Sequence, residues 1–174
     1  MIYTLLIAGM FSFLPSKYCN NEPHYIKLSD KIVKSYKKDI QKKYGLHATG
    51  GGGGFIDAIN VVSITVVSEK PSNLADSRKQ YVELVTDLLY RYNHSEEVRP
   101  FLGNYPFTAK NVRILVIYNS DPNIEVEDRV FTANMRDGLV SYGVKNQYMP
   151  APDDHIREPF EEAYFKVYGK EWTP

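Results

Sequence analysis

The sequence contains a single cysteine, Cys19, and this scarcity excludes two common ways of stabilising a small domain. One cysteine can form neither an intrachain disulfide nor a cysteine-based zinc site, so neither contributes to this fold. With 174 residues, 43% of them hydrophobic, the chain is long enough for one domain with a core and short for two.

An excess of charge of either sign is also lacking, because 21 Lys and Arg residues balance 21 Asp and Glu residues. A neutral chain has no overall electrostatic attraction to nucleic acid or to an anionic membrane. The order of elements over residues 73–168 is similar to a double-stranded-RNA-binding domain, but that domain needs lysines where the last helix here is acidic. We therefore expect no nucleic-acid partner.

Motifs that would identify an enzyme or a metal site are absent as well. The sequence has no H-E-x-x-H pair and no G-x-S-x-G turn, and its four histidines are far apart: His24, His47, His94 and His155. The one compact group of metal-ligand types, residues 153–155, precedes a helix and is interpreted as capping and solvated charge. We expect no metal, no cofactor and no catalytic residue.

Five consecutive glycines, at positions 50–54, raise the question of a phosphate-binding loop. A dinucleotide site needs a strand before the glycines and a helix after them, and here the helical pattern comes first. A P-loop would need Lys and Ser or Thr where Phe55 and Ile56 stand. The glycines are therefore predicted to form a flexible, close-packed turn.

The N-terminal residues 2–14 carry no charge, and this run of 13 residues is shorter than the ~20 needed to span a bilayer. Its length fits the apolar region of a secretory signal peptide. Cys19 follows where a bacterial lipoprotein carries its diacylglyceryl group, although Lys17 and Tyr18 are not the small residues of that motif and no basic residue precedes the run.

We expect residues 1–19 to be a signal peptide or lipid-anchor segment, residues 20–27 a linker, and residues 28–170 a single domain. The alternative is that residues 2–14 form the first strand or helix of the fold. On the first interpretation the protein is exported and lies in the cell envelope or is anchored to a membrane.

Hydrophobic periodicity predicts the class α+β, in the order α-β-α-β-β-β-α. The predicted helices cover residues 28–45, 73–93 and 159–168, with Ser29 and Asn73 as N-caps. The predicted strands cover residues 55–67, 112–118, 130–135 and 139–144, with a hairpin turn at Asp137 and Gly138. They form a four-stranded, mostly antiparallel sheet with helices on one face. Three glutamates are predicted to complement the dipole of the last helix: Glu158, Glu161 and Glu162.

The segment 95–108 is the predicted binding surface. Its glycine and two prolines prevent regular structure, and long loops that are held to the body of a domain often carry function. Its apolar side chains are the candidate binding residues: Phe101, Leu102, Tyr105 and Phe107.

Residues 45–49 (GLHAT), which run into the glycines, and the runs at 98–102 (VRPFL) and 104–111 (NYPFTAKN) resemble a family of uncharacterised exported, lipoprotein-like proteins from Chlamydia-type bacteria. The resemblance covers roughly residues 24–145. That family has no assigned activity, so the resemblance implies export and a small envelope-associated domain, and it implies no site residues.

Two functions remain open from the sequence. The first is a non-enzymatic envelope domain, lipid-anchored at Cys19, that serves as a binding or structural module. Its partner would be another protein or a second copy of the chain, bound through the segment 95–110 and the edge of the glycine turn, while the N-terminal segment meets the membrane. The alternative is a small hydrolase or transferase whose pocket lies beside glycines 50–54 and uses His47 or His94.

Overall fold

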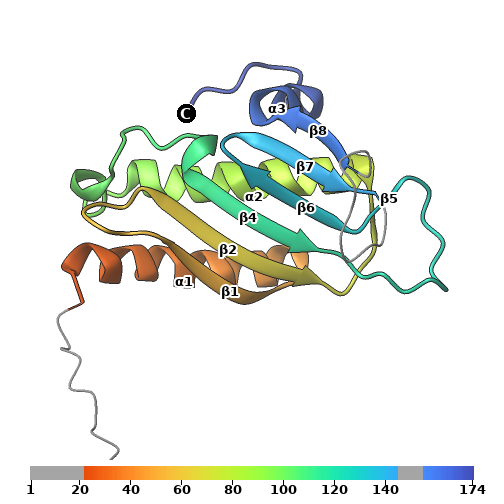
Figure 1. The fold of residues 1–174 in the computed structure, drawn as a ribbon, viewed down its shortest axis with the longest axis horizontal. Helices are drawn as coiled ribbons and strands as arrows, with labels where there is room; N and C mark the ends of the chain where they lie inside the picture. Colours follow the sequence, from red (N-terminus) through yellow and green to blue (C-terminus); the bar gives the residue numbers. More distant parts are fainter. Residues whose placement is uncertain (1–21, 145–154) are drawn as a thin grey trace, which may run out of the picture.

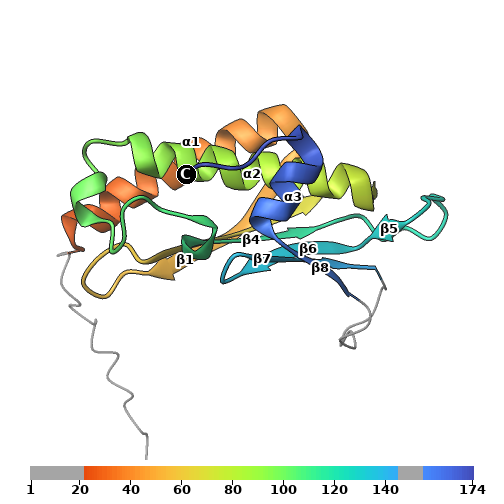
Figure 2. The ribbon, with the colours of Figure 1, turned by 90° about the horizontal axis from the view of Figure 1, so that it is seen from above.

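A six-stranded mixed sheet forms one layer of the structure, and three helices cover one of its faces (Figures 1 and 2). This computed structural model describes residues 22–144 and 155–174. The predicted class α+β is confirmed. The helices are α1 (His24–Tyr44), α2 (Leu74–His94) and α3 (Phe160–Tyr168), with short 3-10 turns at Arg99–Phe101 and Ala109–Asn111.

The strands of the large sheet lie in the order β1 (Leu46–Gly54), β2 (Val61–Ser68), β4 (Val112–Ile117), β6 (Thr132–Arg136), β7 (Leu139–Gly143) and β8 (His155–Pro159). Neighbours are antiparallel except β2 and β4, which are parallel because α2 connects them as a crossover. Two short strands, β3 (Ser72–Asn73) and β5 (Arg129–Val130), pair separately.

The prediction of four strands is wrong, because the glycine run and the segment before α3 are strands too. Glycine has a low strand propensity, yet β1 pairs with β2 from Leu46 to Gly54. A Cβ at Gly53 would lie only 2.6 Å from the ring of Phe55, so close approach of the chain explains glycine there. Strand β8 was missed because Glu158 and Pro159 at its end, followed by Glu161 and Glu162, are typical of a helix start.

The strand predicted over residues 55–67 begins later, at Val61. Val62, Ile64 and Val66 are buried under the helices as their alternation predicted. Residues 55–60 instead form the turn between β1 and β2, and Ile56 has 88% of its surface exposed.

Helix α1 begins at His24, four residues before the predicted start, with Pro23 as its N-cap. Ser29 is therefore not a cap. Its hydroxyl is buried and lies 2.6 Å from the hydroxyl of Tyr92 on α2. Gly45 ends the helix in the left-handed conformation, with φ of 69°.

The cap of α2 and the last hairpin agree with the sequence predictions. Asn73 Oδ1 accepts a hydrogen bond from the Asp76 amide at 2.8 Å. Asp137 and Gly138 both have positive φ, 53° and 81°, as a type I′ turn requires.

The core lies between the sheet and the helix layer and contains several tyrosines whose hydroxyls find partners inside. Tyr81 donates to the carbonyl of Ile114 at 2.6 Å, and Tyr36 donates to the carbonyl of Leu84 at 3.1 Å. These bonds tie α1 to α2 and α2 to β4, so the helix layer and the sheet hold each other in place. No helix in the described part of the chain is long and apolar enough to cross a membrane.

Candidate binding surface

Three segments meet at the end of the domain where α1 begins: the first turn of α1, the β1–β2 turn, and the segment between α2 and β4 (Figures 1 and 2). Hydrogen bonds and a ring stack join them directly. We call their exposed and half-buried apolar side chains the end surface: Tyr25, Phe55, Ile56, Phe101, Leu102 and Tyr105.

Tyr25 connects the start of α1 to both loops. Its hydroxyl donates to the carbonyl of Phe55 at 2.9 Å and lies 3.1 Å from the carbonyl of Ile56. Its ring stacks on Phe101, with centroids 5.8 Å apart and planes inclined by 28°. The first turn of the helix is thus fixed to the rest of the end surface.

The two loops are also joined by their backbones. The Ile59 amide donates to the carbonyl of Phe101 at 2.8 Å, and the Gly103 amide donates to the carbonyl of Ile59 at 2.9 Å. A Cβ at Gly103 would lie 3.0 Å from Cγ of Asn60, so a larger residue there would have to displace the exposed Asn60 side chain.

Phe107 belongs to the core and not to the end surface, because it is fully buried. Its ring stacks on Tyr92 at 5.5 Å. Asn93, also buried, holds its backbone: the Phe107 amide donates to Asn93 Oδ1 at 2.7 Å, and Asn93 Nδ2 donates to the Phe107 carbonyl at 2.9 Å. A buried Phe107 cannot touch a partner, which corrects its place among the candidate binding residues.

The other three candidates do lie at the end surface. Tyr105 has 56% of its surface exposed, whereas Phe101 and Leu102 are half-buried. The guanidinium of Arg99 lies 5.2 Å from the centre of the Tyr105 ring and supports it from one side. Ile56 is the residue that the sequence reasoning missed. It seemed to continue an alternating strand, and only the adjacent glycines signalled a turn.

The chain outside the described structure joins the domain at this same end. Residues 1–21 precede α1, and the ring of its first residue, His24, lies 6.3 Å from that of Phe101. The uncharged run 2–14 and Cys19 lie outside the described residues, but their connection to the domain is at the end surface.

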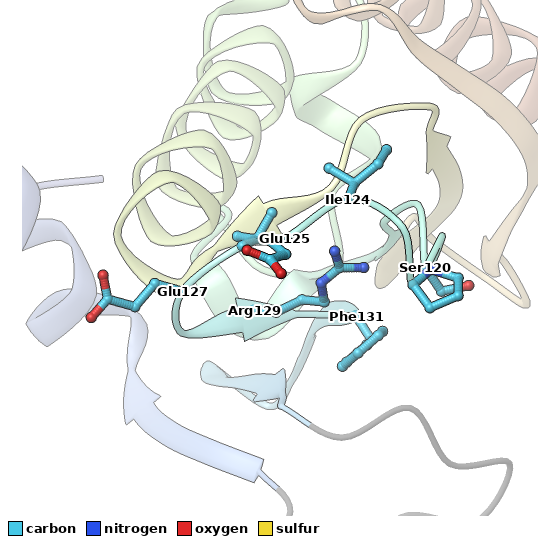
Figure 3. Close-up of a pocket in the computed structure, with 8 residues that line it drawn as sticks. Ser120, Ile124, Glu125, Glu127, Arg129 and Phe131 are labelled. Carbon is cyan, nitrogen blue, oxygen red and sulfur yellow. The ribbon is translucent and has the colours of Figure 1, made fainter.

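A broad depression of about 640 Å³ lies at the loop between β4 and β6. Figure 3 shows Glu125 and Arg129 pointing toward one another across it, whereas Glu127 points away. Arg129 donates to the carbonyl of Asp121 at 3.0 Å and lies 5.8 Å from the ring of Phe131. The arginine is therefore engaged in holding the loop together, and we assign it a structural role.

The groove between α1 and α2, about 490 Å³, is lined by ion pairs. Arg91 binds Asp39 at 2.8 Å and Asp87 at 3.1 Å, and Lys43 binds Glu83 at 3.2 Å. The pairs of Arg91 with Asp39 and of Lys43 with Glu83 join α1 to α2, whereas Asp87 and Arg91 lie one turn apart on α2.

Tyr44 also lies in this groove, where its hydroxyl donates to Glu83. Burial first, and then this hydrogen bond, raise the pKa of Tyr44 to about 12. Its phenol keeps its proton at neutral pH and cannot act as a base there.

His47 and His94 do not come together beside the glycines. His47 pairs with Val67 near the end of β2. Helix α2 starts after β2 and runs in the opposite direction, so His94, its last residue, lies far from His47. His47 lies 3.4 Å from exposed Glu69, and His94 stacks on Tyr90 with ring centroids 4.0 Å apart. Neither the depression at the β4–β6 loop nor the α1–α2 groove includes a glycine of 50–54.

Glu158 is a buried carboxylate on β8, which corrects its predicted place at the start of α3. Arg78 Nε donates to it at 2.6 Å and Lys166 Nζ at 2.7 Å. Burial alone raises the pKa of this carboxyl, but the two hydrogen-bonded cations outweigh burial and hold the pKa below its usual value. The cluster ties β8 to α2 and α3.

Metal binding finds no support in the residues that the structure describes, where no group of three or more His, Cys, Asp or Glu could hold an ion. His155 lies on β8 with Nδ1 3.2 Å from Ser141 Oγ. Asp153 and Asp154 lie outside the described residues.

Comparisons with protein-family models, with curated proteins and with solved structures found no match to this chain.

Proposed function

We propose that this protein is an exported, non-enzymatic domain, held at a membrane of the cell envelope through Cys19, that binds through its end surface. The observation that supports this most is the coincidence of two features at one end of the domain. The uncharged N-terminal run and the only cysteine connect there, and exposed Ile56 and Tyr105 lie there as well.

The build of the end surface suits binding better than catalysis. Its polar contacts are mainly backbone bonds and one tyrosine hydroxyl, which are already paired within the domain. Its two exposed side chains, Ile56 and Tyr105, are apolar and aromatic, and such groups contribute contact area to an interface. Buried Glu158 and the paired groups of the α1–α2 groove form ion pairs that join elements of the fold, so they need no catalytic role.

Fractionation of a bacterium that expresses the full chain tests the tether. The wild-type chain should be found with the membranes, and Cys19→Ser should be released from them, because no other cysteine can carry the lipid. Ser16→Ala, in the same segment, is the matched control and should stay with the membranes. A wild-type chain that remains in the cytosol at its full length would contradict the proposal.

A further inference from the structure

The inference drawn from the end surface rests on the proposed function, in which a lipid on Cys19 tethers the domain to a membrane. Cys19 precedes His24 by five residues. An extended chain spans at most ~3.5 Å per residue, so a lipid on Cys19 would keep the start of α1 within roughly 18 Å of its membrane. The surface that lies nearest to this tether is the end surface.

We propose that the end surface rests on the phospholipid bilayer itself, with Ile56 and Tyr105 inserted at the level of the headgroups. Isoleucine gains by leaving water, and tyrosine is enriched at membrane interfaces because its ring is apolar and its hydroxyl stays hydrated. Phe101 and Leu102 are half-buried members of the same end surface and add to its apolar area. Ile56 is 88% exposed in the free domain, so its contact with lipid displaces water over most of the side chain.

The end surface is prepared for this contact before any lipid arrives. The turn that carries Ile56 is held by Tyr25, and the segment that carries Tyr105 is held by Phe101 against Ile59 and by Asn93. Binding therefore orders little additional chain, which favours a shallow interfacial contact over one that requires refolding.

The charges next to the end surface favour neutral lipid. Glu22 and Asp57 lie beside it in the chain, and so do Lys27 and Arg99, which gives two charges of each sign. Such a surface has no net attraction to anionic headgroups, so we expect contact with zwitterionic phospholipid and little dependence on salt.

Fluorescence quenching by lipid measures this contact directly. The full chain, purified from membranes, is reconstituted into vesicles of brominated phosphatidylcholine, whose bromines quench tryptophan at short range. Ile56→Trp is compared with Ile124→Trp, which replaces another exposed isoleucine, in the loop at the opposite end of the domain (Figure 1). Trp172 stays in both proteins as a common background.

Bromination should remove about half or more of the fluorescence added by Ile56→Trp, because a side chain at the depth of the headgroups lies close to the brominated lipid. It should leave the fluorescence added by Ile124→Trp nearly unchanged. Equal quenching of both, or of neither, in a chain that floats with the vesicles would overturn the lipid contact and leave the tether standing. A blue-shifted but unquenched Ile56→Trp would overturn it in favour of a protein occupant, either a second copy or residues 2–14. A chain absent from the membranes would contradict the tether itself.

Discussion

The ring of Tyr25, in the first turn of α1, stacks on the ring of Phe101 at a centroid distance of 5.8 Å. This pair joins the start of the folded domain to the segment between α2 and β4, 76 residues further along the chain. It fixes the first turn of α1 beside the segments that carry Ile56 and Tyr105, and the proposed orientation on a membrane depends on that geometry.

Truncation of Phe107 should unfold the domain far more readily than truncation of Tyr105. Phe107→Ala removes a fully buried ring that stacks on Tyr92, and such changes cost about 3–5 kcal/mol. Tyr105 is 56% exposed, so Tyr105→Ala should change the free energy of unfolding by less than about 1 kcal/mol. Urea unfolding of both variants measures the difference, and similar losses would mean that Tyr105 is a structural residue.

Two neighbouring glycines of β1 should respond in opposite ways to the same substitution. A Cβ at Gly53 would collide with the Val61 carbonyl and the Phe55 ring, so Gly53→Ala should destabilise the domain by about 1–3 kcal/mol. No atom lies within 4 Å of a Cβ at Gly52, so Gly52→Ala should be neutral or should stabilise by up to about 1 kcal/mol. Thermal unfolding tests the pair, and two equal effects would argue against the register of β1.

Glu158 should matter more for stability than the exposed glutamate on the next helix. Glu158→Gln removes a buried charge from between Arg78 and Lys166 and should cost about 2 kcal/mol, the scale of hydrogen bonds to charged groups. Glu162→Gln removes only an exposed pair with Lys166, four residues on, and should cost about 0.5 kcal/mol or less. If both variants unfold at the same denaturant concentration, the cluster does not hold β8.

The acid limb of the stability curve should carry the signature of Glu158. The Arg78 and Lys166 hydrogen bonds outweigh burial and lower the pKa of Glu158 below its ordinary 4.5, so the unfolded chain binds the proton more tightly. The stability from this group is complete above pH 4.5 and is lost as the pH falls through the folded-state pKa. The stability of Glu158→Gln should therefore fall less steeply below that pH. Parallel curves for the two proteins would show that Glu158 does not titrate differently on folding.

Strong local signals made much of the fold predictable. Asn73 before a periodic helix, the Asp137 and Gly138 turn, and the alternation of Val62, Ile64 and Val66 each depend on residues close in sequence. The strand formed by glycines was not predictable in this way, because its stability comes from pairing with β2 and not from its own side chains.

The end surface was predictable only in part, for the same reason. Phe101 and Tyr105 stood out in a segment rich in proline, but the burial of Phe107 depends on Tyr92 and Asn93 at the end of α2. The exposure of Ile56 depends on where β1 ends, and a run of glycines has no side-chain pattern that would predict that end. Contacts between segments far apart in the chain decided each of these outcomes.

Intact-mass spectrometry of the chain from membrane and soluble fractions tests the central claim most directly. We expect a membrane-bound protein that begins at Cys19 and carries the added mass of a diacylglyceryl group. A soluble, unprocessed chain that begins at Met1 would contradict it, and would return residues 2–14 to the folded domain.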